Sequence, residues 1–90
     1  MNILELKEIL KSEKIPERYY LLEARGIRED KICLEFTDDV WQVYYSERGE
    51  KYNAAEFPDE SGACGEMLQR LRKKNEKRIK REQDGTLGVL

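Results

Sequence analysis

Two segments with the alternation of β-strands follow each other with only three residues between them, and this spacing restricts the fold more than any other feature. Lys31–Phe36 alternates apolar and polar side chains, as expected for a strand with one buried face. Val40–Tyr45 has the same period of two, and one of its faces carries Trp41, Val43 and Tyr45. Since Thr37–Asp39 is long enough only for a tight turn, the two strands are expected to form an antiparallel hairpin.

Two further segments extend this hairpin into a sheet of about four strands. Tyr19–Glu23 is aromatic and apolar, which favours a first strand, and Arg25–Asp30 is interpreted as the loop that follows it. Lys51–Phe57 follows the turn Ser46–Glu50, in which Gly49 is expected to take the left-handed conformation. Because the connections are short, consecutive strands are expected to pair as an antiparallel meander.

One amphipathic helix is predicted before the strands in the sequence and another after them. In Asn2–Ser12 apolar side chains recur at helical spacing, and Pro16 prevents the helix from continuing, while Ile15 is expected to pack against it. Pro58–Ser61 contains short polar side chains of the kind that cap helix N-termini. An apolar stripe with the spacing i, i+3, i+4, i+7 follows at Cys64, Met67, Leu68 and Leu71.

The long C-terminal helix is expected to outrun the body of the protein. Residues 72–83 are almost without apolar side chains and are predicted to continue the helix as a basic extension. Residues 84–90 contain two glycines and are predicted to form a flexible tail. The fold class predicted is therefore α+β, a single domain over residues 1–83 with the long helix packed on one face of the sheet.

The residue types present argue against catalysis. The chain has 90 residues, two cysteines and no histidine. Without histidine the usual zinc sites, catalytic triads and imidazole acid–base chemistry are excluded, and Cys33 and Cys64 lack the spacing of a metal or redox motif. We therefore expect no enzymatic activity, no cofactor and no metal site, with both thiols buried. No apolar run approaches the roughly 20 residues that cross a bilayer, and we expect a cytoplasmic protein without membrane contact.

The charge is distributed unevenly along the chain. Residues 1–66 carry a net charge of −7 and residues 67–90 carry +5, although the whole chain has a formal charge of only −2. Such a dipolar molecule is suited to steering a charged macromolecular partner, since summed surface charge raises encounter rates.

Three stretches of the sequence form a distinctive set, namely Glu5–Tyr20, Trp41–Gly49 and Phe57–Cys64. Together they resemble a group of small bacterial proteins found beside polymorphic toxins of the Rhs or contact-dependent inhibition type, and the similarity spans about residues 1–71. The resemblance implies that the chain is an immunity protein, which neutralises a cognate toxin domain by binding it. We expect a monomer or a weak homodimer.

An acidic surface would suit that role, because toxin nucleases are commonly basic where they hold phosphate. The candidate acidic residues all lie in the predicted turns, although such residues are individually also ordinary turn formers. They are Glu29, Asp30, Asp38, Asp39, Glu47 and Glu50. Tyr44 is the candidate aromatic anchor, since alternation places it opposite the face that carries Trp41 and Tyr45.

A small nucleic-acid-binding protein is the alternative. Lysine and arginine side chains on the basic helix could neutralise phosphates, although a solvated helix face with salt bridges such as Glu76–Lys80 is slightly favoured. The candidate residues are Arg70, Lys73, Lys74, Lys77, Arg78 and Arg81. The order of strands and helix also resembles the three-stranded DNA-binding domains of plant ethylene-response factors and integrases, but this predicted sheet is too acidic to approach phosphate.

Overall fold

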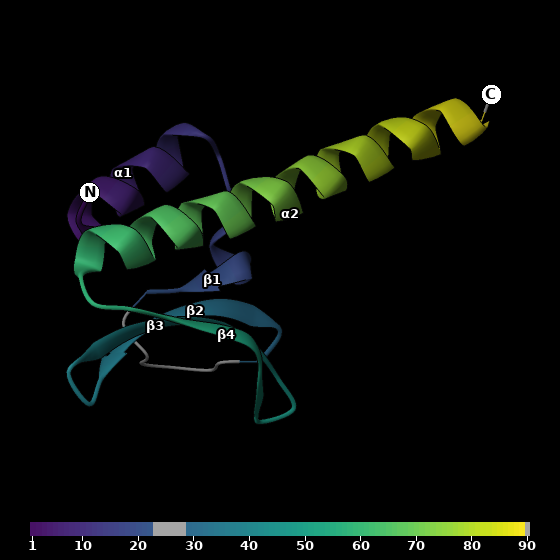
Figure 1. Ribbon diagram of the computed structural model, residues 1–90. Coiled ribbons are helices and arrows are strands. Elements are labelled where there is room, and N and C mark those ends of the chain that lie inside the picture. The colour runs from purple at the N-terminus through teal and green to yellow at the C-terminus, as the bar shows by residue number, and fades with distance from the viewer. Residues whose placement is uncertain (23–28, 90) are drawn as a thin grey trace.

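The computed structural model describes the backbone of residues 1–22 and 29–89 and the side chains of residues 1–22 and 29–80. Two helices lie on one face of a four-stranded sheet, which confirms the α+β class (Figure 1). In chain order the elements are α1 (Ile3–Ser12), the 3-10 turn η1 (Glu17–Tyr19), β1 (Tyr20–Leu21), β2 (Lys31–Thr37), β3 (Val40–Glu47), β4 (Glu50–Phe57) and α2 (Glu60–Val89).

Helix α1 begins with a side-chain cap and ends at a left-handed residue. The Asn2 side chain accepts a hydrogen bond from the Glu5 amide at 2.9 Å. Lys14, with a φ of 57°, turns the chain back, so that the Ile15 amide donates to the Leu10 carbonyl at 3.0 Å. This reversal buries Ile15 against the core, as predicted.

Helix α1 is attached to α2 at both of its ends. At the first turn the Ile3 amide donates to a carboxylate oxygen of Glu60 at 3.0 Å, which satisfies a donor that the helix itself leaves unpaired. Beyond the last turn, the Glu13 carboxylate pairs with the Arg72 guanidinium through two of its nitrogens. The two helices therefore form one layer over the sheet.

The first strand differs from the prediction in length and direction. It contains two residues and pairs in parallel with β2, with Tyr20 opposite Ile32 and Leu21 opposite Cys33. A parallel pair cannot be joined by a tight hairpin, so the predicted antiparallel meander holds only for β2, β3 and β4. The predicted loop Arg25–Asp30 lies mostly outside the described residues.

Two-residue turns join the three antiparallel strands. Asp38 and Asp39 have φ values of 51° and 62°, and Arg48 and Gly49 have 51° and 77°. Two consecutive positive φ values are those of a type I′ turn, whose twist matches that of the flanking strands. Asn53, with a φ of 53°, lies where the register between β3 and β4 shifts in a β-bulge.

The hydrophobic core lies between the sheet and the two helices. The predicted stripe on α2 is the buried one, and it packs with inward-facing side chains of α1 and of the central strands. The core residues contributed by α1 and by strands β2 and β3 are Leu6, Leu10, Ile32, Leu34 and Val43.

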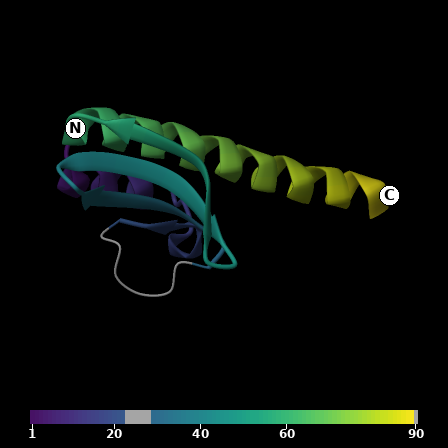
Figure 2. The same ribbon diagram turned by 60° about the horizontal axis from the view of Figure 1, so that its bottom comes forward.

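Helix α2 is longer than the body that it covers. Its 30 residues extend over about 45 Å at 1.5 Å per residue, and its end projects past the sheet in both ribbon views (Figures 1 and 2). The sequence predicts a tail from residue 84, whereas the helix continues to Val89. Glycine lowers helix propensity by only about 1 kcal/mol and does not end a helix as proline does, so two glycines are compatible with this continuation.

Candidate protein-binding surface

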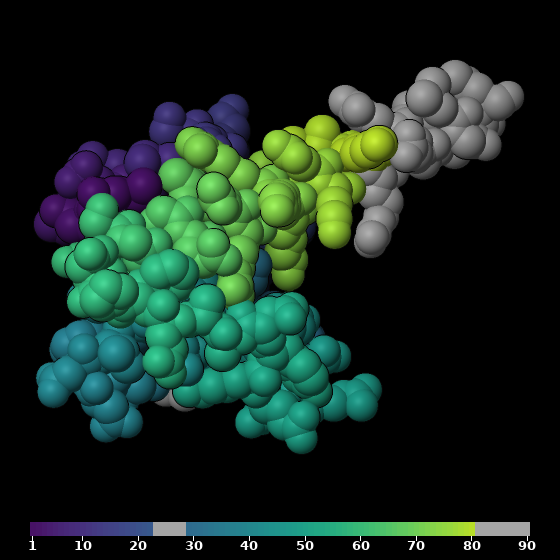
Figure 3. Space-filling model, viewed as in Figure 1, coloured from purple at the N-terminus to yellow at the C-terminus, as the bar shows by residue number. Residues whose placement is uncertain are grey.

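The acidic residues predicted to form one surface lie at opposite ends of the sheet. Glu29, Asp30, Glu47 and Glu50 gather where β2 starts and where β3 turns into β4, whereas Asp38 and Asp39 form the turn between β2 and β3. The two turns lie on opposite sides of the body, with the β2–β3 turn at the lower left and the β3–β4 turn at the lower right (Figures 1 and 3). Strands of seven and eight residues separate the two ends by roughly 20 Å, so the six residues form two separate acidic groups.

At the β3–β4 end, three of the four carboxylates accept hydrogen bonds from the protein. The Glu29 carboxylate accepts a hydrogen bond from the Arg48 amide at 2.8 Å. The other two bonds come from tyrosine hydroxyls: Tyr45 donates to Asp30 at 3.2 Å, and Tyr52 donates to Glu50 at 3.0 Å. These carboxylates support the turn.

The two tyrosines that donate these bonds respond to the acidic surroundings. Burial, followed by the charge of Asp30, raises the pKa of Tyr45. The hydrogen bond to Glu50 is the main cause of a raised pKa at Tyr52. Both phenols therefore remain neutral hydrogen-bond donors. Three of the carboxylates at this end of the sheet already accept hydrogen bonds from within the protein.

At the β2–β3 end, the two carboxylates have no such role. Asp38 and Asp39 are exposed and, within the described part of the chain, neither makes a hydrogen bond or an ion pair. Their side chains extend from a turn whose backbone is fixed by the strands on either side. Two negative charges are thus held in place and available to a partner.

An aromatic pair lies directly behind this turn. Phe36 and Trp41 are opposite each other on β2 and β3, with ring centroids 4.8 Å apart. Phe36 remains 55% exposed, while Trp41 is half-buried and packs against the core together with its neighbour Phe57. We call Phe36, Asp38, Asp39 and Trp41 the aromatic–acidic tip.

Sequence reasoning missed the exposure of Phe36, the outer aromatic member of this tip. Alternation assigns Phe36 to the inward face of β2 together with Ile32 and Leu34, which are both buried. The strand, however, runs past the end of the core, so its last apolar side chain is only partly covered. The position of Phe36 next to a predicted turn is the one signal that could have indicated this exposure.

Tyr44 cannot be the exposed anchor that the sequence predicts, because its side chain is fully buried. Its hydroxyl donates to a carboxylate oxygen of Glu35 at 2.6 Å, and the Lys51 ammonium lies 4.5 Å from the centre of its ring. Alternation along β3 places Tyr44 on the face of the sheet that does not carry Val43. It does not show how well that face is covered by the rest of the protein.

Three of the six predicted nucleic-acid-binding residues contact other side chains of the protein. Arg70 pairs with Glu66 at 2.7 Å, and the side chain of Arg78 bonds to Asn75. The Lys74 ammonium lies 4.7 Å from the ring centre of Tyr19 and 5.5 Å from that of Tyr45. Burial at this position lowers the pKa of Lys74.

Two of the predicted nucleic-acid-binding residues, Lys73 and Lys77, are exposed to solvent. With the exposed Lys80, they have the spacing i, i+4, i+7 of one helix face. The side chain of Arg81 lies outside the described residues. Of the five predicted residues whose side chains are described, Lys73 and Lys77 are exposed, whereas Arg70, Lys74 and Arg78 are partly buried.

The Cys64 thiol is a poor candidate for a nucleophile. It is fully buried, and burial, followed by the charge of Glu60, raises its pKa. Within residues 1–22 and 29–80, no group of three cysteine, aspartate or glutamate side chains is placed to hold a metal ion.

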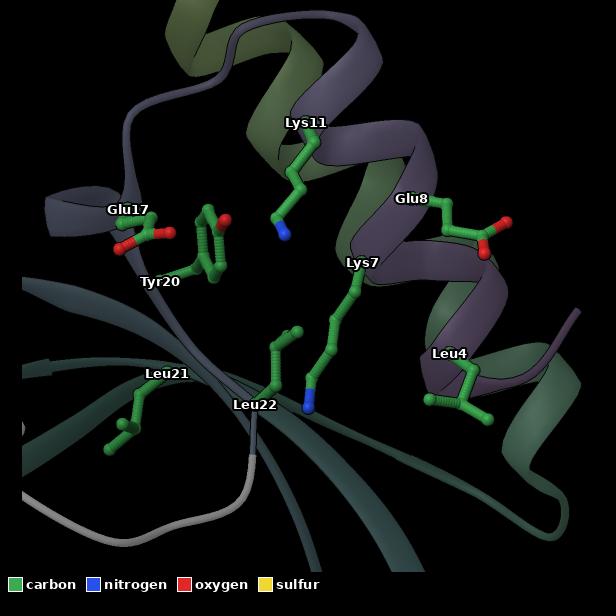
Figure 4. A pocket seen from close by; sticks show the side chains of 8 residues that line it. All are labelled: Leu4, Lys7, Glu8, Lys11, Glu17, Tyr20, Leu21 and Leu22. Atoms are coloured by element: carbon green, nitrogen blue, oxygen red, sulfur yellow. The ribbon is translucent and has the colours of Figure 1, made fainter.

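A groove lies between α1 and β1 (Figure 4). Its volume is about 540 Å³, and one wall is the outer stripe of α1. The opposite wall and floor are formed by η1 and by the edge of the sheet. The lining residues are Leu4, Lys7, Glu8, Lys11, Glu17, Tyr20, Leu21 and Leu22.

Comparison with known proteins adds no relative. No protein-family model, curated protein or solved structure matches the chain. The resemblance to immunity proteins therefore stays a prediction based on the sequence stretches given above. Among the helices of the described residues, none is both long enough and apolar enough to cross a membrane.

Proposed function

We propose that this chain is a non-catalytic protein-binding module of the immunity type, which neutralises a bacterial toxin domain by binding a basic surface with the aromatic–acidic tip. The observation that carries the proposal is the combination of a 55% exposed phenylalanine at the end of β2 with two exposed aspartates in the adjoining turn, whose carboxylates make no hydrogen bond or ion pair with the described residues.

The two kinds of side chain in the tip would make different contributions to binding. An exposed aromatic ring that becomes buried in a partner's pocket supplies affinity, and such anchors dominate many interfaces. The aspartates would attract a basic partner and orient it, which acts mainly on the rate of association. Because the Phe36 ring packs against Trp41 at an interplanar angle of 39°, part of its side-chain freedom is already lost before binding.

The β3–β4 end provides a matched control for this proposal. It is also a type I′ turn with two flanking acidic residues, Glu47 and Glu50, opposite each other in the ladder. Neutralising these two removes the same charge as neutralising Asp38 and Asp39. The net charge of the protein is therefore equal in the two variants, and only the position of the lost charge differs.

The test is an affinity purification of the tagged chain from the organism that encodes it, at moderate salt. We expect one protein partner to co-purify with the parent and with the Glu47→Gln/Glu50→Gln control. The Asp38→Asn/Asp39→Asn variant, in which asparagine preserves the left-handed turn, should recover much less of it. Phe36→Ser should weaken binding at least about tenfold, as expected for the loss of an interface anchor.

The outcome also separates the proposal from its alternative. The exposed face with Lys73, Lys77 and Lys80 is the observation that favours nucleic-acid binding. Nucleic acid that co-purifies and is released by added salt, with no protein partner, would support that alternative and contradict the immunity proposal. Equal recovery of a protein partner by the tip variant and by the control would place the interface elsewhere.

A further inference from the structure

The two edges of the sheet differ in length. Strand β1 has two residues, whereas β4, at the other edge, has eight, of which six are exposed. Among the described residues, β4 has a neighbouring strand only on the side of β3. Its outer edge therefore presents unpaired backbone donors and acceptors with which another strand can pair.

Only some residues of β4 direct their backbone groups to this free edge. In an antiparallel ladder, pairs that exchange hydrogen bonds alternate with pairs that do not. Glu47 and Glu50, which flank the two-residue turn, form the first bonded pair, so the N–H and C=O groups of Lys51 point away from β3. The bulge at Asn53 shifts this alternation by one residue, so beyond the bulge the outward-directed residue is Glu56.

The side chains of Lys51 and Glu56 lie on the same face of the sheet. Lys51 is opposite Ser46 and Glu56 is opposite Gln42, and both partners alternate along β3 with the residues that face the core. Lys51 and Glu56 therefore lie on the face that the two helices do not cover.

Neither of these two charges is balanced by an ion pair within the described residues. The Lys51 ammonium contacts two neutral groups, since it donates to Gln42 Oε1 at 2.9 Å and lies 4.5 Å from the ring centre of Tyr44. Glu56 is exposed and makes no hydrogen bond or ion pair with the described part of the chain. The edge thus carries one charge of each sign, near its two ends.

Full overlap of two β4 strands about a two-fold axis brings these charges together. When all eight residues of each strand are paired antiparallel, Lys51 is opposite Glu56 of the second copy, and the symmetry repeats this contact. Both residues direct their backbone outward, so strand pairing and charge attraction are satisfied in one register. Shorter overlaps centred on either residue would oppose two lysines or two glutamates, which is destabilising.

The same register forms an apolar contact on the other face. It places Tyr52 opposite Ala55 of the second copy. Both residues bond to β3, so in the new ladder they form a pair without hydrogen bonds, in which side chains approach each other most closely. Tyr52 is 43% exposed, and its ring would cover the alanine.

Two features of β4 commonly protect an edge from pairing, namely a lysine and a bulge. In the fully overlapped register, however, the lysine meets a glutamate. The bulges of the two copies, at Asn53, adjoin each other at the two-fold axis, so the residues on either side of them stay in register. Both features therefore act against other strands more than against a second copy.

We propose that β4 is a self-association edge, at which two copies of this chain pair antiparallel into one continuous sheet. Lys51 and Glu56 form reciprocal ion pairs across the two-fold axis, and the helices of both copies lie on the same face. The edge shares no residue with the aromatic–acidic tip, so either proposal can fail without the other.

The test is sedimentation equilibrium of the full chain at low salt. One strand pair is a small interface, so we expect a reversible dimer with a dissociation constant of about 0.01–1 mM. Lys51→Glu and Glu56→Lys should each weaken the dimer at least about tenfold, because each replaces two attractive contacts by two repulsive ones. The combined variant Lys51→Glu/Glu56→Lys should restore the dissociation constant to within about threefold of the parent.

A matched control separates the position of the charge from its amount. Lys73→Glu changes the net charge as Lys51→Glu does, at an exposed position on α2, and should leave the dissociation constant within about twofold of the parent. Hydrogen exchange then identifies the strand. At dimer concentrations the amides of Lys51 and Glu56 should exchange several-fold more slowly, whereas those of Tyr52 and Ala55, which already bond to β3, should not change.

Several results would overturn the proposal. One is a parent that stays monomeric at about 1 mM. Another is a dimer that Lys51→Glu leaves intact, or that the folded combined variant does not restore. Protection of the Lys51 and Glu56 amides only by the co-purified protein partner, with a monomeric parent, would assign the edge to that partner instead of a second copy.

Discussion

Gly49 and Gly65 offer the sharpest test of the backbone geometry, because alanine should have opposite effects at the two positions. A Cβ atom added at either glycine would have no other atom within 4 Å, so neither substitution creates a clash. The difference must therefore come from the backbone. Gly49 has a φ of 77° in the β3–β4 turn, whereas Gly65 lies inside helix α2.

The magnitudes follow from these conformations. Alanine at a left-handed position costs roughly 1–2 kcal/mol, and the stiffer unfolded chain offsets about 0.4–1 kcal/mol of that. Gly49→Ala should therefore destabilise the fold by about 0.5–1 kcal/mol. Inside a helix, alanine is favoured over glycine by about 0.5–1 kcal/mol, so Gly65→Ala should stabilise the fold by that amount.

The measurement is urea-induced unfolding of both variants and the parent, followed by circular dichroism, with thermal unfolding as a second readout. For a chain of this size each kcal/mol corresponds to about 4–8 °C in Tm. The midpoints should lie on opposite sides of the parent with an unchanged dependence on urea. If Gly49→Ala were neutral or stabilising, the left-handed turn assigned to Arg48 and Gly49 would be refuted.

Three further predictions concern the ion pair between the helices, the buried thiol and the core. The hydrogen bond and charge of Arg72 lower the pKa of Glu13. This pair should therefore stabilise the fold above the ordinary glutamate pKa and lose that effect as the pH falls through the lowered pKa. Unfolding at several pH values should show this loss of stability in the parent but not in Glu13→Gln. The Cys64 thiol, buried and with a raised pKa, should resist a thiol reagent in the native protein and react fully in urea, and rapid native labelling would contradict its placement. Leu71→Ala should cost about 2–5 kcal/mol because this side chain is fully buried, whereas the exposed Leu4→Ala should change the stability by less than about 0.5 kcal/mol, as urea unfolding would show.

The elements with strong periodicity could be predicted from the sequence. The central hairpin, the apolar stripe of α2 and the left-handed position at Gly49 are all confirmed, because alternation, helical spacing and tight turns are local properties. The direction of β1 could not be predicted in this way. It depends on how the chain crosses to β2, which no local pattern records.

The candidate site was predicted less well, for two different reasons. The separation of the acidic residues into two groups was contained in the sequence, since successive turns of a meander lie at opposite ends of a sheet. The exposure of Phe36 and the burial of Tyr44 were not, because alternation assigns a side chain to a face without showing where the cover of that face ends. The engagement of Lys74 with Tyr19 and Tyr45 likewise depends on packing between distant elements.

The most direct test of the aromatic–acidic tip is the dissociation constant of the co-purified partner, measured by calorimetry with the parent and two variants of equal net charge. We expect Asp38→Asn/Asp39→Asn to weaken binding several-fold, with a smaller salt dependence, and Glu47→Gln/Glu50→Gln to leave the dissociation constant within about twofold of the parent. Circular dichroism of all three proteins checks that each is folded. Unchanged affinity in the tip variant, or an equal loss in both variants, would contradict the account.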